Sequence, residues 1–246
     1  MKSGLYLFGF LAVAFSDVIH LSPEEAEEAR LALQNPDLYE GDIVGIDGPF
    51  DPERSAIVGS NFRWPNATVP YAVDSSLGNR LELIQAGMDE YHKHTCVKFV
   101  RRTNEPDYVR LFHGIGCYSQ VGRVGGPQDL SLGRGCHQVG TVVHELGHAL
   151  GFYHEQSRSD RDSYLILYLE NAYVSAQYNF FKLSPYQNIL YNDFDYDSIM
   201  IYGNTAFSKN GQNTMEARNG QALIDPYTKT EMSKSDIERV NAMYKC

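Results

Sequence analysis

The chain has 246 residues, of which 43% are hydrophobic and 21% charged. This ordinary globular balance excludes a disordered or fibrous protein, and the net charge of −10 argues against nucleic-acid binding. The charge is uneven, because residues 17–54 hold eleven acidic and two basic residues. The length fits one domain of about 200 residues with a small extra segment, or two small domains.

The first sixteen residues have the pattern of an export signal. Lys2 precedes an apolar run from Leu5 to Phe15, and Ala14 and Ser16 are small residues at the positions that a signal peptidase reads. The run is shorter than the roughly 20 residues that a membrane span needs, and a buried core strand or helix is the alternative. We therefore expect a secreted, extracellular protein without a membrane anchor, with residues 1–16 as signal peptide.

The cysteines can be interpreted in that context. Cys96, Cys117, Cys136 and Cys246 are an even number, which predicts two disulfides in an oxidising compartment. Spacing alone allows three pairings, and a cysteine zinc site is the weaker alternative because the chain has no Cys-x-x-Cys pair. Asn66 begins an Asn-Ala-Thr glycosylation sequon.

The acidic segment predicts one helix followed by loop. Residues 24–33 favour a helix with Ser22 as its N-cap and Pro23 in its first turn. Gly-, Pro- and Asp-rich chain follows, and Arg54 ends the segment at a plausible cleavage site for a trypsin-like protease.

The remaining chain predicts a mixed domain. We expect strands at 69–73, 97–101 and 108–112 and an amphipathic helix at 77–95. Residues 114–135 are predicted to be Gly-rich loop and residues 163–183 are mixed in pattern. A helix at 138–150 should stop at Gly151, and a last helix at 233–244 begins with a capping box.

One run carries the chemistry. His144 and His148 lie four residues apart, so a helix would place both imidazoles on one face, where they can bind one Zn²⁺. Gly151 can reverse the chain and let His154 return as a third ligand. Glu145 points about 100° around the helix from His144, where it can take a proton from a water molecule at the open coordination position.

An ordinary amphipathic helix that happens to carry two histidines is the alternative for the first part of the motif. The fixed spacing of Gly151 and His154 makes chance improbable. We assign surface or packing roles to the other histidines, which are His20, His92, His94, His113 and His137.

The long motif resembles the metzincin zinc proteases, and its continuation from His154 to Asp162 resembles the astacin family. Residues 198–203, Ser-Ile-Met-Ile-Tyr-Gly, are similar to that family's Met-turn. The resemblance covers nearly all of residues 55–246. It implies an α+β, two-lobed protease domain: a twisted, mainly antiparallel-edged sheet with helices in the upper lobe, and an irregular lower lobe with a C-terminal helix.

The resemblance also implies residue roles. His144, His148 and His154 match the zinc ligands, and Glu145 matches the general base. Tyr202 matches a tyrosine that binds zinc at rest and stabilises the oxyanion when substrate binds. Met200 matches the apolar floor of the site. The pairings implied are Cys96–Cys246 and Cys117–Cys136.

The acidic segment gains a role from the same resemblance. Tyr39-Glu40-Gly41-Asp42 is similar to the astacin propeptide motif, in which an aspartate occupies the zinc position of water. Asp42 is therefore the candidate latency switch, with a turn aspartate as the alternative. The family places the mature start at Ser55, after Arg54, and implies that the freed ammonium is buried near Glu155.

Two residues depart from the family pattern. Ile201 stands where the Met-turn usually has His, and Tyr39 where the propeptide motif usually has Phe. That His is not a zinc ligand, so we expect activity to survive. Arg218 and Lys229 are candidates for a cationic pocket that favours acidic side chains after the scissile bond.

We interpret the chain as a zinc endopeptidase, with an acidic propeptide at 17–54 and a catalytic domain at 55–246. Its partners would be protein or peptide substrates and a protease that cuts after Arg54. A catalytically silent zinc-binding module is one alternative, disfavoured by the intact Glu145. A structural zinc domain is the other, disfavoured because three His ligands leave the metal an open position.

Overall fold

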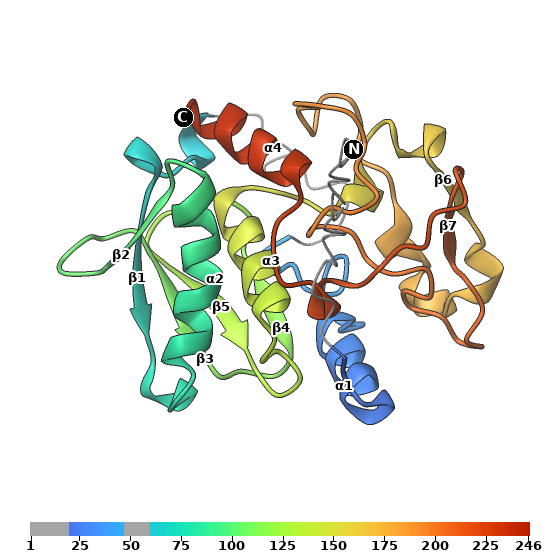
Figure 1. Cartoon of the computed structure of the whole chain (residues 1–246), viewed down its shortest axis with the longest axis horizontal. Coiled ribbons are helices and arrows are strands. Elements are labelled where there is room, and N and C mark those ends of the chain that lie inside the picture. Colours follow the sequence, from blue (N-terminus) through green and yellow to red (C-terminus); the bar gives the residue numbers. More distant parts are fainter. Residues whose placement is uncertain (1–19, 47–59) are drawn as a thin grey trace, which may run out of the picture.

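The computed structural model describes residues 20–46 and 60–246. The expected signal peptide, the cleavage site at Arg54 and the expected mature start at Ser55 lie outside the described residues. Figure 1 shows two lobes: a sheet covered by helices, and a lobe built mostly of loops.

A five-stranded sheet forms the first lobe, in the order β2-β1-β3-β5-β4. Its strands are β1 (Thr68–Val73), β2 (Lys98–Arg101), β3 (Tyr108–Phe112), β4 (Cys117–Ser119) and β5 (Pro127–Leu132). Strands β2, β1, β3 and β5 run parallel to one another, and β4 pairs antiparallel with β5. The sheet is therefore mixed, with one antiparallel edge.

The prediction that residues 114–135 form only loop is wrong, because β4 and β5 both lie there. Polar side chains conceal the apolar alternation of β5. Gln128 and Ser131 are buried, and they donate hydrogen bonds to the carbonyls of Gly122 and Gly116 at 2.8 and 2.7 Å. A buried polar group that is hydrogen-bonded can occupy a position that the hydrophobic pattern assigns to an apolar residue.

Two helices cover one face of the sheet: α2 (Leu81–His94) and α3 (Val139–Leu150). Helix α2 begins later than predicted because Asp74 caps a short 3₁₀ turn at Ser75–Leu77, which Gly78 ends with φ of +53°. Helix α3 is buried on nearly every side, as expected of a helix that crosses the core between the lobes.

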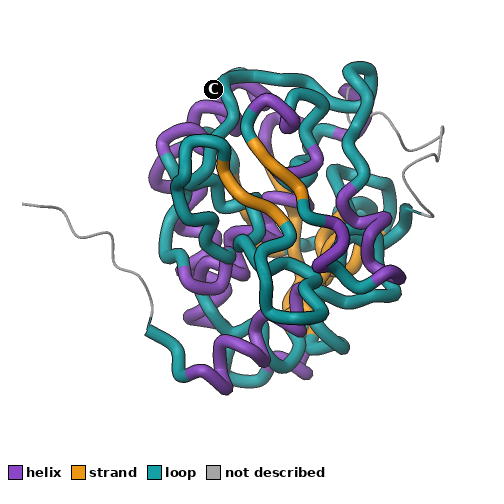
Figure 2. The backbone as a smooth tube through the Cα atoms, turned by 90° about the vertical axis from the view of Figure 1, so that its right-hand side faces the viewer, coloured by secondary structure: helices purple, strands orange, loops and turns teal. Residues whose placement is uncertain are grey.

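The second lobe is predominantly irregular. Figure 2 views it face-on, with a short pair of strands among loops. These strands are β6 (Leu165–Leu167) and β7 (Met215–Ala217), which pair antiparallel. The last helix, α4 (Lys234–Tyr244), begins with the predicted capping box of Ser233 and Asp236.

Two disulfides join the described cysteines with the implied pairing: Cys96–Cys246 and Cys117–Cys136. The first bond ties the end of α4 to the residues after α2.

Helix α1 (Pro23–Leu33) belongs to the N-terminal segment, as we name residues 20–46. Its predicted N-cap is confirmed, since Ser22 and Glu25 form a reciprocal capping box. It packs on Gly116 and Gly135, where an added Cβ would lie 2.8 Å from the Ala32 carbonyl oxygen and 2.7 Å from the Ala32 Cβ, respectively. These glycines precede Cys117 and Cys136, so the second disulfide joins the two turns that support α1.

Candidate metal centre

Helix α3 and the turn after it bring the three motif histidines together. His144 and His148 lie one helical turn apart and are completely buried. Gly151 ends the helix with φ of +118°, a left-handed conformation that glycine adopts without steric cost. The chain then reverses, and His154 returns to the same point with 1% exposure.

Main-chain carbonyls orient the first two imidazoles. His144 Nδ1 lies 2.8 Å from the Ile199 oxygen, and His148 Nδ1 lies 2.7 Å from the Phe152 oxygen. A carbonyl oxygen only accepts, so each Nδ1 carries the proton and each Nε2 presents a lone pair. His144 Nε2 is 3.1 Å from His148 Nε2 and 3.2 Å from His154 Nε2.

These ligand atoms fit a zinc ion. Nitrogen lone pairs that face one another at such distances repel unless a cation lies between them. Asp42 completes the set, with Oδ2 2.9 Å from His144 Nε2 and 3.2 Å from His154 Nε2. One ligand atom from each of the four buried residues lies within 4.8 Å of the others. Three imidazole nitrogens and one carboxylate oxygen match the four-coordinate preference of zinc, so the cluster can bind one metal ion.

The N-terminal segment delivers Asp42 as part of an extended pairing with β4. The Ser119 amide donates to the main-chain carbonyl oxygen of Asp42 at 2.9 Å, and the Val44 amide donates to the carbonyl oxygen of Ser119 at 3.0 Å. Gly41 before it has φ of +94°, and a Cβ there would lie 2.7 Å from the Leu33 oxygen. Only glycine therefore fits this approach.

Glu145 lies beside the cluster without a hydrogen-bond partner for either carboxylate oxygen among the described residues. It is completely buried. Burial and the nearby Asp42 carboxylate raise the pKa of Glu145 well above its usual value. A buried carboxyl group with a perturbed pKa is typical of a site that transfers protons.

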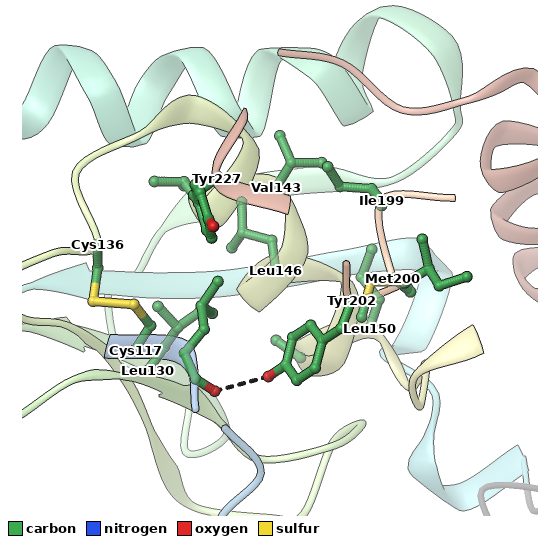
Figure 3. Close-up of a cluster of buried hydrophobic side chains, with 14 of the residues drawn as sticks. Cys117, Leu130, Cys136, Val143, Leu146, Leu150, Ile199, Met200, Tyr202 and Tyr227 are labelled. Atoms are coloured by element: carbon green, nitrogen blue, oxygen red, sulfur yellow. Dashed lines mark hydrogen bonds between the residues drawn. A yellow bond between two sulfur atoms is a disulfide. The ribbon is translucent and has the colours of Figure 1, made fainter. Parts of the chain in front are cut away.

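Tyr202 reaches the same point from the second lobe. Its hydroxyl lies 2.5 Å from Asp42 Oδ2 and 2.8 Å from the Leu33 carbonyl oxygen. Figure 3 shows the ring among buried side chains, with a dashed line that marks a hydrogen bond of its hydroxyl. The N-terminal segment therefore contacts Tyr202 through both a main-chain oxygen and a carboxylate.

Met200 packs under α3, where the helix has no side chain at Gly147. A Cβ on Gly147 would lie 2.6 Å from the Met200 Sδ. Ile201 is completely buried, so an apolar side chain suits its position. Asp236 holds the turn by accepting from the Ser198 hydroxyl at 2.6 Å and from the Ile199 amide at 2.7 Å.

Glu155 forms a separate buried ion-pair cluster. Its Oε1 accepts from Arg158 at 3.0 Å, from Arg239 at 2.8 Å and from the Asp195 amide at 2.8 Å. Burial raises the pKa of Glu155 to about 7. Arg158 and Arg239 thus already provide positive charge around the carboxylate for which the family resemblance implied a contact with the mature N-terminus.

Other predicted residues lie away from the cluster. Asn66 is exposed, with φ of +55°. Lys229 is half-buried and donates to the Ser198 carbonyl oxygen at 2.6 Å, and the exposed Arg218 donates to the Asp162 carbonyl oxygen at 2.9 Å.

Sequence reasoning missed four residues of the site. Glu40 contacts His154, and Asn179 and Tyr178 bind the main chain around Glu40. Gly147 provides the close contact with Met200. Only Gly147 had a local signal, as a glycine inside a helix where alanine is favoured.

A sequence profile of the family described as Astacin (Peptidase family M12A) matches residues 57–245. The chain belongs to the astacin family of zinc metalloproteases. The zinc-protease interpretation and the α+β, metzincin-like fold are thereby confirmed.

Relatives and a solved structure agree with this membership. "Astacin-like metalloprotease toxin 1" of Loxosceles intermedia is 45% identical over 214 residues, covering 85% of this chain and 81% of the toxin. "Zinc metalloproteinase nas-6" of Caenorhabditis elegans is 37% identical over 233 residues, covering 91% and 67% of the two chains. The structure of high choriolytic enzyme 1, a hatching-enzyme zinc-protease of Oryzias latipes, matches with a TM-score of 0.67 and 40% identity, covering 76% and 92%.

Proposed function

We propose that the chain is a secreted zinc endopeptidase made as a latent precursor. In this proposal residues 1–16 are the signal peptide, residues 17–54 the propeptide and residues 55–246 the catalytic domain. Family membership supports the chemistry, and the position of the Asp42 carboxylate among the three histidines supports the latency.

His144, His148 and His154 would hold the zinc ion through their Nε2 atoms, with Asp42 as fourth ligand in the precursor. When bound there, zinc supplies a Lewis acid that polarises the scissile carbonyl and lowers the pKa of a coordinated water. The buried main-chain contacts of His144 and His148 support this assignment, because they fix which nitrogen faces the metal.

Glu145 would act as the general base. Its carboxylate lacks any hydrogen-bond partner in the described residues, so it is available to take a proton from the attacking water and return it to the leaving amine. Tyr202 would donate its hydroxyl hydrogen to the oxyanion that develops on the substrate carbonyl. Its present partners, Asp42 and Leu33, both belong to the N-terminal segment, so removal of that segment would free the hydroxyl.

Activation would follow cleavage after Arg54 by a trypsin-like protease. The new N-terminal ammonium at Ser55 would then be buried near Glu155. The pairing of Glu155 with Arg158 and Arg239 supports a structural role for that carboxylate.

The precursor would be exported and glycosylated at Asn66, whose exposed position is compatible with a glycan. Among the described residues, no helix has the length and apolar character to cross a bilayer. Substrates would be proteins or peptides. A toxin and a hatching enzyme among the relatives show that family members serve different biological purposes.

The test is hydrolysis before and after trimming. Residues 17–246 are produced, cut after Arg54 with trypsin, and assayed on a denatured protein with and without a zinc chelator. We expect chelator-sensitive cleavage only after trimming, and none from a trimmed Glu145→Ala variant. A trimmed chain that binds zinc but cleaves no substrate would instead indicate the catalytically silent binding module.

A further inference from the structure

We propose that Glu40 is a positioning residue of the precursor's metal centre. Its carboxylate holds the proton of His154 on Nδ1 and so directs the Nε2 lone pair toward the metal. This inference rests on the proposed latency and adds a second carboxylate to it, one that acts through a ligand rather than as a ligand.

The imidazole of His154 lies between two carboxylates that are two residues apart in the chain. Glu40 Oε2 is 2.6 Å from His154 Nδ1, and Asp42 Oδ2 is 3.2 Å from His154 Nε2. Both acidic side chains are buried, with exposures of 1% and 0%. An ionised carboxylate only accepts hydrogen bonds, so Glu40 selects the tautomer with hydrogen on Nδ1.

His154 differs from the other two histidines in the source of its outer partner. His144 and His148 contact carbonyls of Ile199 and Phe152, which belong to residues 55–246 and stay after cleavage. Glu40 belongs to the N-terminal segment and would leave with it. The set of outer partners seen here is therefore complete only while the segment is bound.

The local backbone is arranged for this contact. Glu40 has φ of +51°, an uncommon conformation for a residue with a side chain. Its amide donates to Asn179 Oδ1 at 2.9 Å, and the Tyr178 hydroxyl donates to the Leu38 oxygen at 3.1 Å. A strained residue with a buried carboxylate persists when its surroundings hold it there, and such residues gather at functional sites.

The function of such a contact is to hold the metal in the precursor. Outer carboxylate partners of zinc-binding histidines orient the ring and make the ligand more basic, and their loss typically costs 10–100-fold in affinity. The precursor would thus bind zinc more tightly through Glu40, in addition to the closure of the site by Asp42.

The experiment measures zinc release from the uncleaved, zinc-loaded chain to a coloured chelator, with Glu40→Leu, Glu40→Gln and the wild type. We expect release about 10–100-fold faster from Glu40→Leu. Glutamine keeps a neutral acceptor at the same place and should give a smaller increase. A second readout is the proton resonance of the His154 Nδ1–H, which should be far downfield in the wild type, less so in Glu40→Gln and moved most in Glu40→Leu.

Two controls separate positioning from docking and from the proposed latency. Glu28→Leu removes an ion pair with Arg134 between α1 and the catalytic domain, away from the three metal-site histidines, and should leave the resonance unchanged. Asp42→Ala tests the fourth ligand: if it alters neither zinc release nor latency, the proposed function fails. If Asp42→Ala alters both while the Glu40 variants match the wild type, only the role of Glu40 is overturned. If Glu40→Leu does not fold, Glu40→Gln decides the question. Zinc release at the wild-type rate together with an unshifted His154 resonance in Glu40→Gln would overturn the role of Glu40.

Discussion

The Tyr202 hydroxyl lies 2.5 Å from Asp42 Oδ2, and the same oxygen lies 2.9 Å from His144 Nε2. One carboxylate oxygen thus contacts both a candidate metal ligand and the candidate oxyanion donor. Displacing Asp42 would open a ligand position and release a hydrogen-bond donor in one event.

Asp42→Ala should make the uncleaved chain active on a short fluorogenic peptide. The variant vacates the fourth ligand position, while the rest of the N-terminal segment still narrows access, so we expect less activity than after full trimming. The matched control is Asp37→Ala, which removes an exposed carboxylate of the same segment. The uncleaved Asp37→Ala chain should stay inactive. Equal latency of Asp42→Ala and wild type would count against the switch.

Tyr202→Phe, tested after trimming, should lower kcat by about 10²–10³-fold, the usual effect of losing one oxyanion donor. KM should change little, because the hydroxyl is needed most in the transition state. Steady-state kinetics separate the two parameters. A variant that keeps wild-type kcat would remove Tyr202 from the chemistry.

Gly147→Ala should destabilise the chain by about 1–3 kcal/mol through overpacking, although alanine usually favours a helix. The new methyl group would approach the Met200 Sδ, since a Cβ at residue 147 lies 2.6 Å from it. The check is a double-mutant cycle with Met200→Ala, measured by denaturant unfolding. The Gly147→Ala cost should shrink when Met200 is truncated, and simple additivity would contradict the contact.

Asp236→Asn should loosen the Met-turn. The carboxylate accepts from the Ser198 hydroxyl and the Ile199 amide, and Ile199 in turn accepts from His144. Replacing one oxygen with an NH₂ group removes an acceptor from a buried set, so we expect a loss of about 1–3 kcal/mol in the free energy of unfolding. A matched change is Asp197→Asn, at an exposed carboxylate next to Ser198 in sequence, which should cost little.

The Asp236 carboxyl group also determines how the stabilities of the wild type and Asp236→Asn differ with pH. Burial raises the pKa of Asp236 in the folded chain above its ordinary value of 3.8. The folded state therefore binds this proton more readily than the unfolded state, and the contribution of Asp236 to stability falls as pH rises through the folded pKa. The wild type should gain stability relative to Asp236→Asn on acidification from neutral pH, and denaturant midpoints measured across that range would reveal the opposite trend if the sign is wrong.

The sequence predicted the metal-binding motif well because its spacing is local. Helix α3, Gly151 and the return of His154 lie within sixteen residues and depend on helical periodicity and one left-handed residue. The N-cap of α1 and the capping box of α4 were equally local. The Cys96–Cys246 bond spans 150 positions, and only family resemblance indicated its pairing.

Long-range contacts explain what the sequence could not predict. Strand β5 was missed for a different reason: its buried Gln128 and Ser131 conceal the apolar alternation and bond to carbonyls in the loops that precede it. The contact of Glu40 with His154 joins residues 114 positions apart, and no periodicity describes it. Asp236 likewise reaches Ser198 from a helix 38 positions away.

The pairing of residues 42–44 with β4 has a consequence for association between molecules. The Ser119 amide and carbonyl both bond to the N-terminal segment, so this outer strand presents no open main-chain groups at that residue while the segment is bound. If the segment is removed, as proposed, the same groups could pair with any extended chain, including the outer strand of another copy. In the proposed precursor the segment would thus cover an open edge of the sheet, and trimmed protein should aggregate more readily at high concentration than the uncleaved chain does.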